Sequence, residues 1–189
     1  KGHARLECPD DTWRFLYEAA IHSLVLHSPE DVYPGPYTYK RFWFRDAAFI
    51  IHALLCTGLT DRAERALYQF PDRQLKSGYF RSQEGEWDAN GEVLWILRRF
   101  HELTGCPLHR EWQEPVRQGA RWIQKKRVSD TLNKPHAGLL PAGFSAEHLG
   151  PNDYYYWDDF WGIAGLQAAQ ALFRPLDKQT SERFGAGAR

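Results

Sequence analysis

The 189-residue sequence contains no methionine and has no net charge, with 24 Lys and Arg residues against 24 Asp and Glu residues. Because the chain lacks a start residue of its own, we expect it to be a processed or excised piece of a longer protein. The balanced charge favours neither nucleic acid nor an anionic membrane as a partner. The longest run of basic residues, 125–127, falls in a helical pattern and is interpreted as a solvated helix face.

Cysteine is scarce, and long apolar runs are missing. The three cysteines, Cys8, Cys56 and Cys106, are far apart and match neither a disulfide framework nor a metal site. Cys56 falls in an apolar helical pattern, which predicts a buried free thiol. No apolar stretch is long enough to span a bilayer, and the first residues do not resemble a signal peptide. The sequence also has no glycine-rich phosphate loop and no metal-ligand spacing of histidines, so it predicts neither a cofactor nor a metal.

Aromatic residues are abundant instead, at 15% of the chain with eight tryptophans, and the hydrophobic pattern is helical. Two kinds of helical pattern alternate along the chain. The amphipathic kind, with an apolar stripe on one face, covers residues 11–27, the residues from 60 onward, and residues 110–127. The nearly all-apolar kind, which predicts burial on every side, covers residues 44–57, the residues from 88 onward, and residues 155–173. The stripe of the first helix consists of Trp13, Leu16, Tyr17, Ala20 and Leu24.

This alternation predicts an all-α fold of three helical hairpins. In each hairpin the amphipathic helix faces solvent, and the apolar helix lies further in between its neighbours. Small residues in 155–173, including Gly162 and Gly165, predict a close approach of that helix to its neighbours. Three such hairpins form an arc, and we interpret 1–189 as a single partial domain.

Residues suited to chemistry cluster where the three apolar helices begin. The first start reads YKRFWFRDA and contains Arg45 and Asp46, the second reads EGEWDANGE and contains Asp88, and the third reads YYYWDDFW and contains Asp158 and Asp159. If the inner helices start at one end of the arc, these segments meet. The sequence therefore predicts one aromatic and acidic pocket.

Each of these residues also has a purely structural interpretation. Arg45 and Asp46 are adjacent and could be two separate surface charges. Asp88 could cap the helix that follows it. Asp158 and Asp159 could serve the dipole of theirs. The aromatic residues 154–157 could be ordinary core. Two further residues in a loop, Glu147 and His148, could line the pocket or be solvated.

The three segments resemble the glucoamylase-related six-hairpin glycosidases, which fold as an (α/α)6 toroid. YTYKRFWFRDAAFIIHALLCTGLTDRAERAL is similar to the first inner-helix region of that group, WDANGEVLWIL to its second inner helix, and YYYWDDFWGIAGLQAA to its Trp-Glu-Glu segment. The resemblance covers most of residues 35–173 and implies that Asp158 is the general acid and Asp159 a supporting carboxylate. It also implies a set of substrate-binding residues: Trp43, Arg45, Asp46, Trp87, Asp88, Tyr156 and Trp157.

Two departures from the family pattern bear on the chemistry. Aspartate stands at 158 and 159 where the group has glutamate, although trehalases in the wider group use an aspartate as acid. The family's general base lies in the second half of the toroid, beyond the region that this chain resembles. We therefore expect the chain to be the N-terminal half of the catalytic domain, to need the missing C-terminal half as a partner, and to be inactive alone.

The resemblance implies a glycoside hydrolase that acts on α-glucosides or oligosaccharides, with inversion at the anomeric carbon. The alternative is a non-catalytic sugar-binding or regulatory module of the same superfamily. A toroid for isoprenoids or peptides is a further alternative, but a lipid pocket would not need Arg45 and Asp46 beside Asp88 and Asp158.

Overall fold

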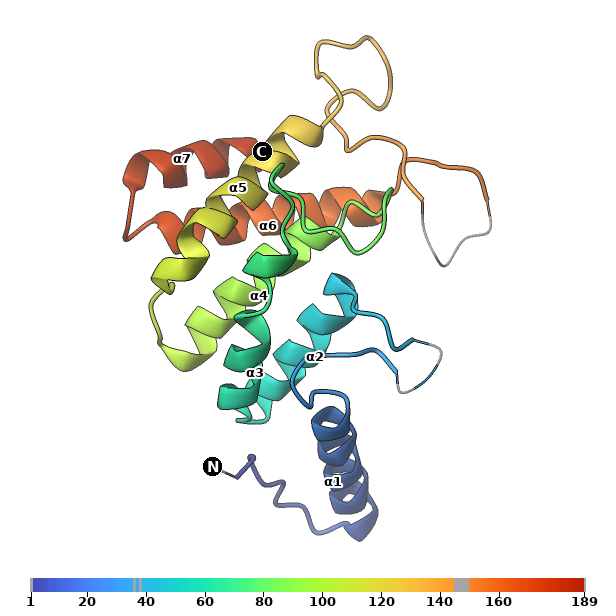
Figure 1. Ribbon diagram of the computed structural model, residues 1–189, viewed down its shortest axis with the longest axis vertical. Helices are drawn as coiled ribbons and strands as arrows, with labels where there is room; N and C mark the ends of the chain where they lie inside the picture. Colours follow the sequence, from blue (N-terminus) through green and yellow to red (C-terminus); the bar gives the residue numbers. More distant parts are fainter. Residues whose placement is uncertain (1, 36, 38, 145–149, 189) are drawn as a thin grey trace.

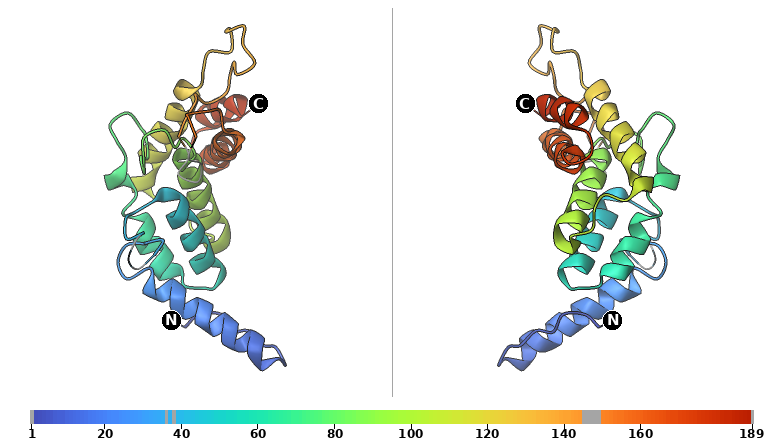
Figure 2. Two further views of the ribbon diagram at one scale, coloured as in Figure 1. Left: turned by 90° about the vertical axis from the view of Figure 1, so that its right-hand side faces the viewer. Right: turned by 90° about the vertical axis from the view of Figure 1, so that its left-hand side faces the viewer.

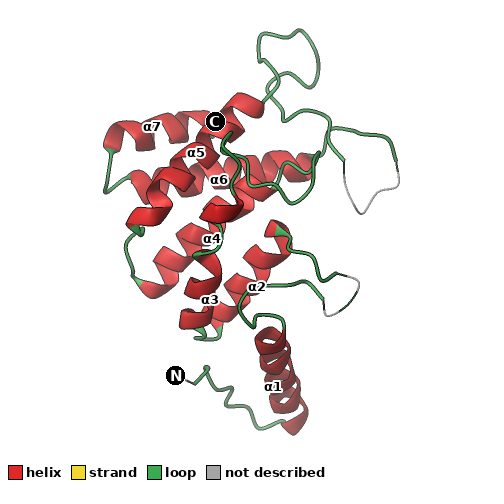
Figure 3. Cartoon of the chain, in the orientation of Figure 1, coloured by secondary structure: helices red, strands yellow, loops and turns green. Residues whose placement is uncertain are grey.

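The computed structural model describes residues 2–35, 37, 39–144 and 150–188. Throughout these residues the regular structure is helical, with isolated β-bridges in place of any strand (Figures 1 and 3). The helices are α1 (Asp11–Leu26), α2 (Phe44–Cys56), α3 (Thr60–Leu67), the 3₁₀ helix η1 (Pro71–Arg73), α4 (Ala89–Thr104), α5 (Arg110–Lys126), α6 (Tyr156–Phe173) and α7 (Lys178–Gly187). The predicted all-α fold class is confirmed.

The three apolar helices lie next to one another, with α4 between α2 and α6 (Figure 1). The shorter α3 packs on α2 and α4, α5 packs on α4 and α6, and α7 packs along α6. The core is continuous through these contacts, and α4 supplies much of it because nine of its residues are buried. None of the described helices is both long enough and apolar enough to cross a membrane.

Helices α4 and α6 cross with their backbones in contact. A Cβ atom on Gly91 would lie 2.0 Å from the carbonyl oxygen of Trp161, and one on Gly165 would lie 2.6 Å from the Cα of Gly91. Any side chain at either position would therefore push the helices apart. The close approach predicted for the small residues of this helix is observed at Gly165.

Helix α1 departs from its predicted packing. Trp13 is 61% exposed and Leu16 is also exposed, while Ile21 is the buried residue of the helix. Figure 2 shows α1 projecting from the rest of the molecule, and its packing is chiefly against α2. Its predicted stripe therefore finds no neighbour over most of its length among the described residues.

The composition of α2 predicted burial on every side. The structure shows that one face of this helix is exposed. Its buried residues, such as Ile51 and Leu54, face α3 and α4. Phe49 and Cys56 lie on the opposite face and are exposed. The prediction of a buried Cys56 was therefore wrong, because an apolar sequence does not by itself supply a neighbour for each face of a helix. Cys56 is a free thiol, as are Cys8 and Cys106.

Helix α7 was not predicted. Its sequence, KQTSERFGAG, is polar and contains two glycines, so it lacks an apolar stripe. The Asp177 carboxylate caps it by accepting a hydrogen bond from the backbone N–H of Thr180 at 3.0 Å. Phe184 anchors it in the core, where its ring packs against Phe173 of α6.

Candidate active site at the starts of α2, α4 and α6

One carboxylate oxygen joins the starts of the three apolar helices. Asp88, which directly precedes α4, is 1% exposed. Its Oδ2 accepts a hydrogen bond from Arg45 Nε of α2 at 2.7 Å and from Trp157 Nε1 of α6 at 2.8 Å. Three segments far apart in the sequence therefore meet at Asp88. Asp88, Glu92 and Asp158, together with Arg45, are called the acidic cluster below.

Asp88 does not cap α4, although it occupies the capping position. Its backbone is already helical, with φ −67° and ψ −33°, and its side chain makes no capping hydrogen bond. A capping residue instead has an extended backbone that turns its side chain back over the first turn. The carboxylate of Asp88 is therefore turned toward α2 and α6.

Asp158 lies in the first turn of α6, next to Trp157, and is 5% exposed. Burial and the charge of Asp88 raise the pKa of the Asp158 carboxyl to about 7, while the Arg45 guanidinium partly opposes the shift. A carboxylic acid with this pKa keeps its proton in a large fraction of molecules near neutral pH. That protonation state is the one that a general acid requires.

Sequence reasoning missed Glu92, which lies one helical turn after Asp88 in α4. Its side chain is fully buried, and Oε1 lies 4.0 Å from Arg45 Nε. Burial, followed by the charge of Asp88, raises the pKa of the Glu92 carboxyl well above its usual value. A signal was present in the sequence, because Glu92 stands four residues after Asp88 at the edge of the apolar run VLWIL.

An exposed aromatic surface adjoins the acidic cluster. The Trp157 ring is 46% exposed. It packs edge-on against Trp161 at 5.8 Å between ring centroids, and Trp161 in turn contacts Phe49 of α2 and Trp95 of α4. Tyr156 is 70% exposed at the start of the same helix. Flat aromatic faces held next to carboxyl groups are the chemistry that sugar rings need, since each ring has an apolar face and a rim of hydroxyls.

Trp87 lies apart from this surface, in the core. It is 5% exposed, its Nε1 donates to the carbonyl oxygen of Pro141 at 3.0 Å, and the Lys126 ammonium lies 3.7 Å from the ring centroid. Its ring faces are thus occupied by the protein. The structure places Trp87 where it holds the loop before α6 and not where it could stack on a ligand.

Asp159 also points away from Asp88 and Asp158. Its Oδ1 accepts a hydrogen bond from the backbone N–H of Leu140 at 2.8 Å. Burial raises the pKa of the Asp159 carboxyl, and the Leu140 N–H and the Arg127 charge partly oppose that. Asp159 lines a separate hollow of about 230 Å³ bordered by α5, α6 and the end of α7. The structure gives Asp159 a role in fixing the loop around Leu140.

The remaining predicted residues lie around the first turn of α2. Asp46 is half-buried and close enough to Glu92 for its charge to raise the pKa of that carboxyl. Trp43 directly precedes α2, and the Arg41 guanidinium lies 4.5 Å from its ring centroid. Glu147 and His148 lie outside the described residues.

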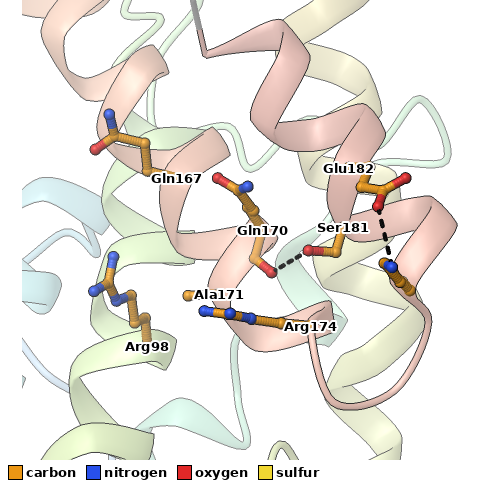
Figure 4. A pocket seen from close by; sticks show the side chains of 8 residues that line it. Arg98, Gln167, Gln170, Ala171, Arg174, Ser181 and Glu182 are labelled. Carbon is orange, nitrogen blue, oxygen red and sulfur yellow. Dashed lines mark hydrogen bonds and ion pairs between the residues drawn. The ribbon is translucent and has the colours of Figure 1, made fainter.

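A second hollow, of about 630 Å³, lies at the other end of α4 and α6 (Figure 4). Its lining includes three basic residues, Arg98, Arg174 and Lys178. The other polar residues around it include Gln167, Gln170 and Glu182. Arg98 pairs with Glu102 at 2.7 Å and Lys178 with Glu182 at 3.9 Å. Most of its positive charge is thus neutralised locally, and none of the predicted site residues line it.

No family model, curated protein or solved structure matches this chain. Nor do the described residues contain a group of three His, Cys, Asp or Glu side chains arranged to hold a metal ion.

Proposed function

We propose that the acidic cluster is half of a glycoside hydrolase active site, with Asp158 as the general acid. The observation that carries the proposal is the burial of the Asp158 carboxyl beside an exposed tryptophan and a buried anion, which raises its pKa to about 7. An acid catalyst in a glycosidase is kept protonated by such an environment. The substrate class we propose is an α-glucoside or an oligosaccharide.

In this proposal the aromatic surface binds the sugar. Trp157, which is half-exposed, offers its indole to a sugar ring, and the hydrogen bond from its Nε1 to Asp88 fixes the plane of the indole. Arg45 is held by Asp88 as well, and about a fifth of its side chain is exposed, so it can reach sugar hydroxyls from the same anchor. A substrate would therefore meet groups that are already oriented, which lowers the entropic cost of binding.

The bond-breaking step follows from the protonation state. Asp158 donates its proton to the glycosidic oxygen, the bond from that oxygen to the anomeric carbon breaks, and the leaving sugar departs as an alcohol. A second carboxylate takes a proton from water, which attacks the anomeric carbon from the opposite face. For inversion the two carboxyl groups must lie roughly 6.5–9.5 Å apart.

We further propose that this second carboxylate comes from the other half of an (α/α)6 toroid. Asp88 is ill suited to be the base because its carboxylate already binds Arg45 and Trp157. The exposed apolar residues on α6, such as Phe160 and Ile163, and Phe49 on α2 are surfaces that further inner helices would cover.

One observation favours the alternative of a non-catalytic sugar-binding module. The acidic cluster supplies an acid and the adjoining aromatic surface a stacking face, and these would suffice for binding without turnover. The two candidates differ in one outcome, because a binding module takes up oligosaccharide without releasing a shorter product.

The test combines binding with hydrolysis. Binding of maltose and longer malto-oligosaccharides to the chain is measured by calorimetry for the wild type, Trp157→Ala and Trp13→Ala. Trp13 is the matched control because it is an exposed tryptophan on α1, the helix that projects from the rest of the molecule (Figure 2). We expect Trp157→Ala to weaken binding at least tenfold and Trp13→Ala to leave it unchanged.

Hydrolysis is measured in the protein as isolated from its source, with the same sugars and trehalose. Release of β-glucose from an α-linked substrate would support an inverting hydrolase. Binding without any release would favour the binding module, and equal binding by Trp157→Ala and wild type would overturn the proposed sugar site.

A further inference from the structure

Glu92 is a buried carboxyl group without a donor. Its side chain is 0% exposed, and neither oxygen accepts a hydrogen bond from a donor in the part of the chain that the structure describes. The Asp88 side chain, itself an acceptor, lies within hydrogen-bonding range of Glu92. The nearest cation, Arg45 Nε, lies 4.0 Å from Oε1 and is already bonded to Asp88 at 2.7 Å. A carboxylate left in this state would bear the full cost of desolvation.

The charged groups around Glu92 come from each helix start. Arg45 and Asp46 face it from α2, Asp88 precedes its own helix, and Asp158 of α6 lies next to Asp88. The carboxyl groups of Asp88, Glu92 and Asp158 thus lie close enough to the guanidinium of Arg45 to interact with it. If Glu92 and Asp88 were both ionised, two buried anions would repel each other beside one cation.

A proton on Glu92 resolves this conflict. Asp88 is itself an acceptor, so a hydrogen bond between the two side chains requires that one of them is protonated. Asp88 accepts from Arg45 and Trp157, which stabilises its ionised form, whereas Glu92 has no such donor. The proton therefore belongs on Glu92, and burial and the charge of Asp88 raise its pKa in the same direction.

We propose that Glu92 is a neutral carboxylic acid that donates a hydrogen bond to Asp88, and that this bond holds Asp88 in position to accept from Arg45 and Trp157 at once. Glu92 is then a positioning residue. It acts on the aromatic surface indirectly, because Asp88 accepts the hydrogen bond that orients Trp157. Asp158 directly follows Trp157 in the chain, so its position depends on the same contact. The importance of Glu92 for an acid catalyst rests on the proposed function. The protonation of Glu92 and its positioning of Trp157 do not depend on that function.

The protonation is tested directly by NMR with glutamate labelled by ¹³C at the side-chain carboxyl. We expect a signal at the chemical shift of a protonated acid at pH 7 that disappears in Glu92→Gln. Glu102→Gln is the matched control, because Glu102 lies on the same helix but on its surface, paired with Arg98 and Arg99. If no glutamate carboxyl that is lost in Glu92→Gln is protonated at pH 7, the proposal is overturned.

The positioning is tested on the indole N–H of Trp157, assigned by comparison with Trp157→Phe. Glutamine and leucine both have about the volume of glutamate, but only glutamine can donate to Asp88. We expect the Trp157 N–H signal to keep its position in Glu92→Gln, and to shift and exchange with solvent at least tenfold faster in Glu92→Leu. Equal behaviour of the two variants would mean that Glu92 only fills space.

A pH titration separates the same two roles. As the pH rises through the ionisation of Glu92, the Trp157 N–H signal of the wild type should move, while that of Glu92→Gln should not move in that range. A wild-type signal that is insensitive to the ionisation of Glu92 would overturn the positioning role. If Glu92→Leu does not fold, comparing the titration of the wild type with that of Glu92→Gln still shows whether Glu92 positions Trp157.

These measurements need neither sugar nor turnover, so their failure is distinct from failure of the proposed function. If Glu92 is protonated and holds Trp157 but the wild type binds no sugar, only the glycosidase proposal falls. If the wild type hydrolyses sugar and Glu92→Leu retains the same kcat and KM, the function stands and the positioning role falls.

Discussion

Asp158 and Asp159 show how two adjacent carboxyl groups acquire different roles. Successive residues of an α-helix differ by about 100° around its axis. That rotation turns Asp158 toward Asp88 and Arg45, and Asp159 toward the backbone of Leu140. The sequence DD marked an acidic helix start, but it did not indicate which carboxyl group faced the other two helices.

The first prediction concerns the acid itself. Asp158→Asn should lower kcat by about 10²–10⁴-fold, because an amide cannot donate the required proton. Sugar binding should persist. Asp159→Asn is the control and should have a smaller effect, since Asp159 holds the loop at Leu140. Steady-state kinetics on the protein from its source check this, and unchanged turnover in Asp158→Asn would remove Asp158 from the mechanism.

The second prediction concerns stability against pH. The pKa of Asp158 is 3.8 in the unfolded reference and about 7 when folded, so between these values the folded state binds more protons than the unfolded state. The free energy of unfolding must then fall as the pH rises, by at most about 1.4 kcal/mol per pH unit from this group. Glu92 adds a fall of the same sign above its reference value of 4.5.

Asp158→Asn should therefore be more stable than the wild type at pH 7, with a flatter pH profile between pH 4 and 7. Urea unfolding at a series of pH values measures this. Asp130→Asn, a change at an exposed loop carboxylate, is the control and should leave the wild-type profile in place. A variant less stable than the wild type at pH 7 would show that the Asp158 carboxyl is not held protonated.

At the scale of helices, the contact of α4 with α6 determines where Trp157 and Asp158 lie relative to Asp88. The two helices touch at Gly91 and Gly165, and the hydrogen bond from Trp157 to Asp88 joins the starts of the same two helices. The hydrogen bond is 2.8 Å long, so separating the helices by the width of a methyl group would break it.

The third prediction is that Gly165→Ala destabilises the protein by about 1–3 kcal/mol, because the added Cβ meets the backbone of α4. Gly162→Ala on the same helix is the matched control. There a Cβ would lie at an ordinary 3.5 Å from Ile123 and Leu140, and alanine favours a helix by about 1 kcal/mol over glycine. Thermal unfolding compares them, and equal midpoints would contradict the close contact.

Helix positions could be predicted well where apolar residues recur with a helical period, as in α2, α4 and α6. The packing of each face could not, because Phe49 and Trp13 look like core residues until the positions of neighbouring helices are known. Helix α7 was missed because it has no apolar stripe. Its N-terminal cap and one buried ring, that of Phe184, hold it against the core instead. At the site, the sequence indicated Asp88 and Asp158 by their segments, but gave no reason to place Trp87 in the core.

At the scale of the whole molecule, two helices each carry several exposed apolar residues. One is α1, where Trp13, Phe15 and Leu16 are exposed. The other is α6, which contains Phe160 and Ile163. Large apolar patches on a protein surface mark contacts with further chain or with other molecules.

The fourth prediction is that the 189-residue chain self-associates and shows little hydrolysis by itself. Sedimentation velocity should reveal species larger than a monomer that grow with concentration. Replacing Trp13 and Phe15 by glutamine should reduce them, whereas replacing the exposed polar residue Lys178 by glutamine should not. Robust hydrolysis by a monomeric chain would contradict the half-toroid proposal.

The backbone contact between Gly91 and Gly165 also has a consequence for local unfolding. Two helices whose backbones touch cannot open one at a time without losing the contact along both, so α4 and α6 should form one cooperative unit. Their amide hydrogens should exchange with solvent most slowly, at rates set by global unfolding. Helix α1, which projects from the molecule, should exchange long before them (Figure 2). The residues that meet at Asp88 would then keep their geometry while the N-terminal helix repeatedly unfolds and refolds.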